Sequence, residues 1–185
     1  MIGADALGSP FRGNGGISFC AFPDMSDAVE IRLCVNGAAV QRRVPARQSL
    51  VDFLREGLGL TGTRAGCEHG VCGACTVRLD GAPVRACLVF AAQLDGARVE
   101  TIEGLSDSGE IAALQAAFHA RNALQCGFCT AGMLVIAAEL LKRGEVPSRA
   151  EIRGLLSGNY CRCTGYHAII DAVEAACRAR AGNPG

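Results

Sequence analysis

The chain has 185 residues, half of them hydrophobic and 19% charged. This composition supplies enough apolar side chains for one or two domains with hydrophobic cores, and it argues against wholesale disorder. Eighteen Lys and Arg residues balance eighteen Asp and Glu residues, aromatic residues make up 5%, and Trp is absent. A neutral chain with so few aromatic side chains lacks the basic surface and the stacking platforms of a nucleic-acid-binding protein.

The eleven cysteines raise the question of compartment. The first residues show neither the charged start nor the apolar run of a secretory signal, and no stretch approaches the length of a membrane span. In a reducing cytosol a cysteine-rich chain more often binds metal than forms disulfides. We therefore expect a cytoplasmic protein without a transmembrane segment.

The chain begins with an irregular stretch and then changes to strand periodicity. Residues 1–28 are rich in Gly and show no apolar period, so we expect a flexible N-terminal extension. Apolar and polar residues alternate over 29–35, and an Asn36-Gly37 corner separates them from 38–44. This pattern predicts a β-hairpin.

A helix and a second hairpin follow. Ser49 is expected to cap an amphipathic helix that ends by Gly59. The second hairpin turns at Asp80-Gly81, and a final strand is expected near residue 100. Residues 29–103 should therefore form one domain, in which a small sheet packs on one helix.

The C-terminal part of the chain has helical periodicity. Apolar residues recur at i, i+3 and i+4 in four segments: 110–123, 131–144, 149–157 and 167–181. Ser148 and Glu151 have the spacing of a capping box for the third segment. We expect a four-helix domain over 111–180, joined to the first domain by a linker over 104–110 and followed by a tail over 181–185.

Eight cysteines fall into two quartets of different spacing. The first, C-x4-C-x2-C-x11-C, consists of Cys67, Cys72, Cys75 and Cys87. The second, C-x2-C-x31-C-x-C, consists of Cys126, Cys129, Cys161 and Cys163. C-x4-C-x2-C with a distant fourth cysteine is the plant-type ligand spacing for a [2Fe–2S] cluster. Two such sets predict a chain that carries electrons, and we assign it no catalytic residue.

The surroundings of these cysteines suit a buried cluster with negatively charged thiolates. Gly66, Gly70 and Gly73 let the backbone of the first loop wrap closely and direct N–H groups at sulfur. Each cysteine pair of the second quartet precedes a predicted helix, whose first N–H groups offer partial positive charge.

Zinc is the alternative metal, because it also takes four cysteine ligands. The glycine-rich first loop favours iron–sulfur, whereas the second quartet by itself also fits a structural zinc site. His69 lies in the first loop, but a Rieske centre needs two histidines, so we expect His69 to face solvent. Cys177 shares a helix face with apolar residues and is expected in the core. Cys20 and Cys34 receive no role.

Three segments carry a resemblance to a known family: GTRAGCEHGVCGACTVRLDG at 62–81, QCGFCTAGM at 125–133 and LSGNYCRCTGY at 156–166. They resemble the iron–sulfur subunit of the molybdenum hydroxylases, the family of xanthine dehydrogenase, aldehyde oxidoreductase and carbon monoxide dehydrogenase. Tyr160 stands where that family commonly has an aliphatic residue, and we expect a simple exchange within the core.

The resemblance implies an α+β fold, with an N-terminal β-grasp, ferredoxin-like domain followed by a four-helix [2Fe–2S]-binding domain. It implies two [2Fe–2S] clusters on this chain, molybdopterin-bound molybdenum on a large partner subunit and FAD on a medium-sized one. The assembly would be a dimer of heterotrimers. Electrons would pass from the molybdopterin site to the helical domain, then to the ferredoxin-like domain and then to FAD. By the same likeness, Gln125 and Cys163 would contact the pterin.

We therefore expect the electron-transfer subunit of a heteromeric molybdenum hydroxylase, an oxidoreductase whose substrate chemistry resides on another chain. The alternative is a free-standing two-cluster ferredoxin, although such shuttles often carry an acidic docking surface and this chain is neutral. A zinc-stabilised scaffold is the third hypothesis.

Overall fold

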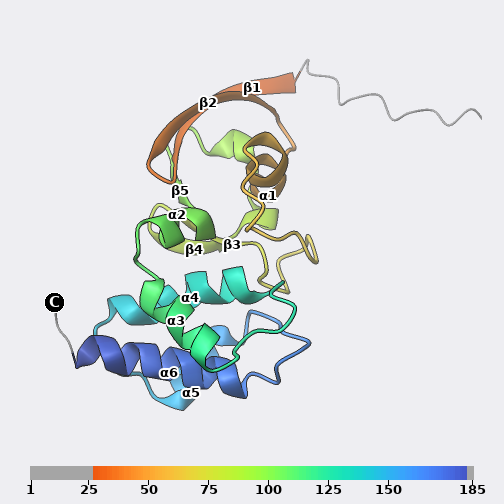
Figure 1. Cartoon of the computed structure of the whole chain (residues 1–185). Coiled ribbons are helices and arrows are strands. Elements are labelled where there is room, and N and C mark those ends of the chain that lie inside the picture. The colour runs from red at the N-terminus through yellow and green to blue at the C-terminus, as the bar shows by residue number, and fades with distance from the viewer. Residues whose placement is uncertain (1–26, 183–185) are drawn as a thin grey trace, which may run out of the picture.

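The computed structural model describes residues 27–182. The extension expected over 1–28 therefore lies outside the described residues except for its last two, as does the tail beyond residue 182. Cys20 also lies outside them. Within this range the chain forms two layers of different type, a sheet domain at the top of Figure 1 and a helical domain at the bottom.

The first domain is built on a five-stranded sheet in the order β2-β1-β5-β3-β4. Its strands are β1 (Ala28–Val35), β2 (Ala38–Pro45), β3 (Thr76–Leu79), β4 (Ala82–Arg85) and β5 (Arg98–Glu100). β1 pairs with β2 antiparallel and with β5 parallel, and β3 pairs antiparallel with both β4 and β5. Both hairpins turn where predicted, at Asn36-Gly37 and Asp80-Gly81, because all four corner residues have positive φ.

One helical segment covers this sheet, as predicted. Helix α1 (Leu50–Asp52) continues directly into a π-helical turn over Phe53–Gly57, next to the sheet in Figure 1. The backbone N–H of Asp52 donates to the Ser49 hydroxyl at 3.2 Å, which confirms the predicted cap. Leu50, Phe53 and other apolar side chains of this segment pack on the inward-facing strand residues to form the first core.

The second domain contains the four predicted helices, α3 (Ala112–Ala120), α4 (Thr130–Lys142), α5 (Arg149–Leu156) and α6 (His167–Ala181). The Ser148–Glu151 capping box at the start of α5 is present. A fifth helix, α2 (Ile102–Asp107), occupies much of the stretch expected as a linker over 104–110. It is helical because Leu105 is buried in the second core and the Thr101 N–H at its start donates to Asn36 Oδ1 at 2.8 Å.

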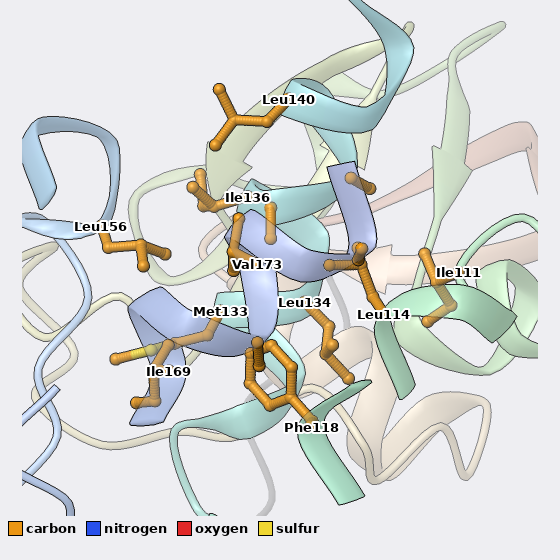
Figure 2. Packing of buried hydrophobic residues seen from close by; sticks show 14 of the residues in the cluster. Ile111, Leu114, Phe118, Met133, Leu134, Ile136, Leu140, Leu156, Ile169 and Val173 are labelled. Carbon is orange, nitrogen blue, oxygen red and sulfur yellow. The ribbon is translucent and has the colours of Figure 1, made fainter. Parts of the chain in front are cut away.

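The helical domain closes around α4, which packs against β3 on one side and against α5 and α6 on others. Figure 2 shows apolar side chains from the four predicted helices meeting in one core. Cys177 lies in this core with 2% of its surface exposed, which confirms its predicted structural role. Burial raises the pKa of its thiol.

A buried arginine joins the two domains. Arg78 on β3 is 2% exposed and forms ion pairs with Glu110 at 2.7 Å, with Glu139 of α4 at 3.2 Å and with Glu100 of β5 at 3.3 Å. Burial opposes the charge of Arg78, but the hydrogen bonds and charges of these carboxylates outweigh it and raise the pKa of the guanidinium. This junction was not predicted, because its partners lie far apart in the sequence.

Candidate iron–sulfur sites

The first cysteine loop is a tight backbone turn that emerges before β3. Glu68, Gly70 and Gly73 all have positive φ, so the chain reverses direction repeatedly over a few residues. A side chain at Gly66 would place its Cβ 3.0 Å from Cys72 Sγ, and one at Gly70 would place it 2.5 Å from a Leu88 methyl group. The loop therefore forms a cradle that side chains at the glycine positions would fill.

The thiols of the first quartet lie in two interacting pairs, Cys67 with Cys72 and Cys75 with Cys87. The Cys72 N–H donates to Cys67 Sγ at 3.3 Å. This N–H, together with that of His69, lowers the pKa of the Cys67 thiol to about 6. Burial, together with the neighbouring Cys75 thiol, raises the pKa of Cys87 to about 11. The loop thus directs donors at one sulfur while it shields another.

The second quartet is assembled from two distant stretches of chain. Cys129 directly precedes the first residue of α4, whereas Cys161 and Cys163 lie between α5 and α6. Again the thiols form two pairs. Cys126 and Cys163 have their Sγ atoms 3.5 Å apart, and Cys129 interacts with Cys161.

The electrostatic surroundings of the second quartet differ from thiol to thiol. Burial raises the pKa of Cys129 to about 12. The N–H of Phe128 lowers the pKa of Cys126, while the hydrogen bond with Cys126 raises that of Cys163. Burial opposes ionisation of Cys161, but its hydrogen bonds outweigh this and lower its pKa. One of them comes from the Thr164 hydroxyl, which donates to Cys161 Sγ at 3.1 Å.

The donor set is chemically suited to a [2Fe–2S] cluster. The thiols of each quartet influence one another's pKa, and in the second quartet the Sγ atoms of Cys126 and Cys163 lie 3.5 Å apart. A [2Fe–2S] cluster takes four thiolates, two on each iron, so four neighbouring thiols beside backbone N–H donors suit such a cluster.

The two cysteine loops touch each other across the domain boundary. The Tyr160 N–H donates to the Cys72 carbonyl at 2.8 Å. Cys72 belongs to the first quartet and Tyr160 directly precedes Cys161 of the second, so this hydrogen bond joins the two loops. Phe128, which precedes Cys129 and is 46% exposed, also approaches the first loop: its ring lies 3.3 Å from where a Cβ on Gly66 would be. The sequence analysis did not predict this contact between the two loops, although Phe128 and Tyr160 both lie in the segments that resemble the family.

The remaining residues singled out in the sequence are at the surface. The Gln125 side chain is exposed and donates to the Cys163 carbonyl at 3.0 Å, so these two residues lie side by side. His69 is exposed in its loop, as predicted. Tyr160 is 55% exposed, so the expectation of an exchange within the core was wrong: its backbone turns toward the first loop and its ring turns to solvent.

Comparison with known proteins decides the family. A domain model described as "2Fe-2S iron-sulfur cluster binding domain" matches residues 33–105, and one described as "[2Fe-2S] binding domain" matches residues 101–174. The nicotine 6-hydroxylase small subunit of Paenarthrobacter nicotinovorans is 54% identical over 151 residues, which cover 82% of this chain and 91% of that protein. The chain belongs to the small iron–sulfur subunits of the molybdenum hydroxylases.

Further relatives agree with this membership. The caffeine dehydrogenase subunit gamma of Pseudomonas sp. (strain CBB1) is 52% identical, over 78% of this chain and 88% of that protein. The crystal structure of quinoline 2-oxidoreductase from Pseudomonas putida 86 contains a chain with a TM-score of 0.78 and 50% identity, over 84% of this chain and 97% of that one.

Membership in this small-subunit family confirms the predicted resemblance and the α+β fold of a ferredoxin-like domain followed by a helical [2Fe–2S]-binding domain. It also establishes the chain as a subunit of an oxidoreductase complex. In the described part of the chain, no helix has the length and apolar character needed to cross a membrane.

Proposed function

We propose that this small subunit carries electrons within a heteromeric molybdenum hydroxylase, from a molybdopterin site on a large subunit to FAD on a medium-sized subunit. The observation that carries the proposal is that four interacting thiols gather in each of two cysteine sites, and that a backbone hydrogen bond from Tyr160 to Cys72 joins the two sites. When bound, each of two [2Fe–2S] clusters would accept and release one electron at a time.

In this proposal the first quartet, Cys67, Cys72, Cys75 and Cys87, holds the cluster of the ferredoxin-like domain. Its loop supplies backbone N–H groups to the Cys67 sulfur, which offset the negative charge of the bound thiolates. Cys75 is 2% exposed, so one side of this site is shielded from water while the loop side stays near the surface.

The second quartet, Cys126, Cys129, Cys161 and Cys163, holds the cluster of the helical domain. Cys129 lies at the N-terminus of α4, where unpaired N–H groups and the helix dipole favour negative charge. This helix has 13 residues; Cys129, just before it, is buried, and its first two residues are half-buried. The fold thereby places a fixed positive potential at a site that must hold thiolates.

The partners are proposed from the exposed side of the second loop and from the relatives. Cys126, Cys163 and Gln125 are exposed, and we place the pterin of the large subunit against Gln125 and Cys163. The relatives bear the names small subunit and subunit gamma, which supports an assembly of several chains. We propose a dimer of heterotrimers in the cytoplasm.

We further propose a nitrogen heterocycle as the substrate of the complex, bound on the large subunit. The relatives described above are named for nicotine, caffeine and quinoline, which all contain a nitrogen-bearing ring. The purified complex should hydroxylate quinoline or nicotine faster than benzaldehyde. A preference for the aldehyde would contradict this substrate class and leave the electron-transfer role unaffected.

Metal analysis of the chain, tagged and purified from its native host, tests the proposal. We expect about four iron atoms per chain, two for each cluster, together with molybdenum from the associated large subunit. Iron without molybdenum after gentle purification would favour a free-standing two-cluster ferredoxin. Zinc in place of iron would overturn the proposal.

A Cys163→Ser variant tests the assignment of the second quartet. It should lose the spectroscopic signal of one cluster, keep the other, and stop reduction of the flavin by substrate. Cys34→Ser is the matched control, because Cys34 is a half-buried strand cysteine outside both quartets. Unimpaired flavin reduction in Cys163→Ser would contradict the proposed route.

A further inference from the structure

Asn159 is a buried polar residue at the contact between the two cysteine loops. Its side chain is fully buried, although it lies only two residues before Cys161 in an irregular segment after α5. Its amide Nδ2 donates to the Gly73 carbonyl at 3.0 Å. Gly73 directly follows Cys72, so this hydrogen bond spans from one predicted ligand loop to the other.

Both the nitrogen and the oxygen of the Asn159 side-chain amide form hydrogen bonds. Arg85, at the end of β4, donates one Nη2 hydrogen bond to Asn159 Oδ1 at 3.2 Å and another to the Gly158 carbonyl at 2.7 Å. A carbonyl only accepts and a guanidinium only donates, so the central side chain must donate to Gly73 and accept from Arg85. Asn meets both demands, whereas Asp lacks the donor and Ala lacks both groups.

The surrounding backbone is packed so closely that Asn159 has little room to shift. A Cβ on Gly73 would lie 2.5 Å from the Gly158 carbonyl and 2.7 Å from Asn159 Cγ. A Cβ on Gly132, in the first turn of α4, would lie 3.0 Å from Asn159 Nδ2. The amide is thus enclosed by the first loop, by α4 and by the turn after α5.

The same segment is held at its other end by a tyrosine. The Tyr166 hydroxyl donates to the Asn159 carbonyl at 3.2 Å and accepts from the Cys161 N–H at 2.8 Å. The position of Asn159 is therefore transmitted to Cys161 through a fixed pair of hydrogen bonds. A substitution at Asn159 is therefore expected to change the position of Cys161 relative to Cys72.

We propose that Asn159 is a positioning residue that clamps the Cys72–Gly73 backbone to the Cys161 segment and thereby fixes the separation of the two clusters. This inference rests on the proposed function, because it requires a cluster in each quartet. Asn159 is not one of the eight cysteines assigned to the clusters. Its effect is on geometry: magnetic and electronic coupling between two centres both fall with their separation.

The test uses the intact complex with Asn159→Asp, which keeps the size of the side chain but removes its donor, and with Asn159→Ala in case the first variant fails to assemble. The matched control is Glu139→Gln, which weakens a different contact between the domains, the 3.2 Å ion pair with Arg78, and leaves the loops untouched. The readout is the low-temperature electron paramagnetic resonance spectrum of the fully reduced complex, together with its iron content.

We expect the wild type and Glu139→Gln to show two cluster signals with resolved splitting from their magnetic interaction. Both Asn159 variants should keep the iron and both signals but lose the splitting. Unchanged splitting in both variants would overturn the proposal, and loss of a whole cluster in both would assign Asn159 to cluster assembly instead. Absence of cluster signals from the wild type would refute the proposed function itself, which separates the two failures.

Discussion

The two cysteine loops reach similar thiol pairing by different means. In the first loop, Cys67, Cys72 and Cys75 lie within nine residues, and their arrangement follows from positive-φ backbone positions in one short stretch. In the second, 31 residues separate Cys129 from Cys161, and a helix–turn–helix path must bring them together. The first site is therefore encoded locally, whereas the second depends on how α4, α5 and α6 pack.

This difference predicts distinct vulnerabilities. Substitutions that alter the backbone should damage the first site, and substitutions that alter core packing should damage the second. The contact through Asn159 and Tyr160 makes the two sites interdependent only where the loops meet. The following changes test this contrast, in order of their expected effect on stability.

The largest effect is expected from truncation of an isoleucine in either hydrophobic core. Ile169, at the start of α6, and Ile31, on β1, are 1% and 0% exposed, so each Ile→Ala change should cost about 2–5 kcal/mol of unfolding free energy. Ile169→Ala should also reduce iron in the second site, because α6 positions the Cys161–Cys163 segment. Ile31→Ala should leave the iron in the first site largely in place, although it destabilises the fold by a similar amount. Iron content and paramagnetic resonance provide the measurement. If Ile31→Ala lost the first cluster as fully as Ile169→Ala lost the second, the two sites would not differ in their dependence on core packing.

Gly73→Ala tests the locally encoded site. Gly73 and Gly81 have φ values of 75° and 86°, so alanine at either position costs about 1–2 kcal/mol of backbone strain. At Gly73 the new Cβ would also lie 2.5 Å from the Gly158 carbonyl, whereas at Gly81 nothing lies within 4 Å. Gly73→Ala should therefore be the more destabilising by about 1–3 kcal/mol and should lose the first cluster. Denaturant unfolding and iron analysis of the two variants provide the measurement. Equal stability and equal iron content in Gly73→Ala and Gly81→Ala would contradict the prediction.

The junction between the domains makes stability depend on pH through Glu110. Its hydrogen bond with Arg78 holds the pKa of Glu110 below its ordinary value of 4.5. A depressed folded-state pKa stabilises the fold above the unfolded-state value, and this stabilisation is lost as the pH falls through the folded-state value.

Glu110→Gln should therefore lower stability by about 1 kcal/mol near neutral pH, because the carboxylate is partly exposed to solvent. The difference from the wild type should shrink below pH 4.5 and vanish in stronger acid. Thermal unfolding across this range provides the measurement. A difference that stays constant with pH would show that the carboxylate charge is not what stabilises the junction.

The smallest effect is expected at Cys177. Replacing this buried thiol with Ala leaves a small cavity in the helical core and should cost about 1 kcal/mol or less. Both clusters should keep their iron and their spectra. Loss of a cluster from Cys177→Ala would place this cysteine among the ligands and revise the second quartet.

Much of the fold could be predicted because its signals are local. The Asn36-Gly37 and Asp80-Gly81 corners, the Ser49 cap and the Ser148–Glu151 capping box each depend on residues a few positions apart, and all are present. Helix α2 was missed because its short sequence contains the glycine and serine residues of a linker. Burial of Leu105 against a distant core makes it helical.

The exposed Tyr160 ring shows where pattern reasoning fails at single residues. Its neighbours Asn159 and Cys161 are buried or half-buried, and the family likeness suggested an apolar role. The backbone hydrogen bond to Cys72 instead fixes the main chain so that the ring points outward. The choice depends on a contact that spans 88 positions and has no local signature.

The sequence by itself indicated the two domains and the spacing of the cysteines, because spacing and periodicity can be read along the chain, and three motif segments carried the resemblance to the family. Only the tertiary structure decided how the domains are joined. The Arg78 carboxylate cluster, the Asn159 clamp and the contact between the loops arise when residues from separate elements meet in a buried space. There each polar group needs a partner of complementary hydrogen-bonding type, and such pairing is a property of the packed arrangement rather than of any one segment.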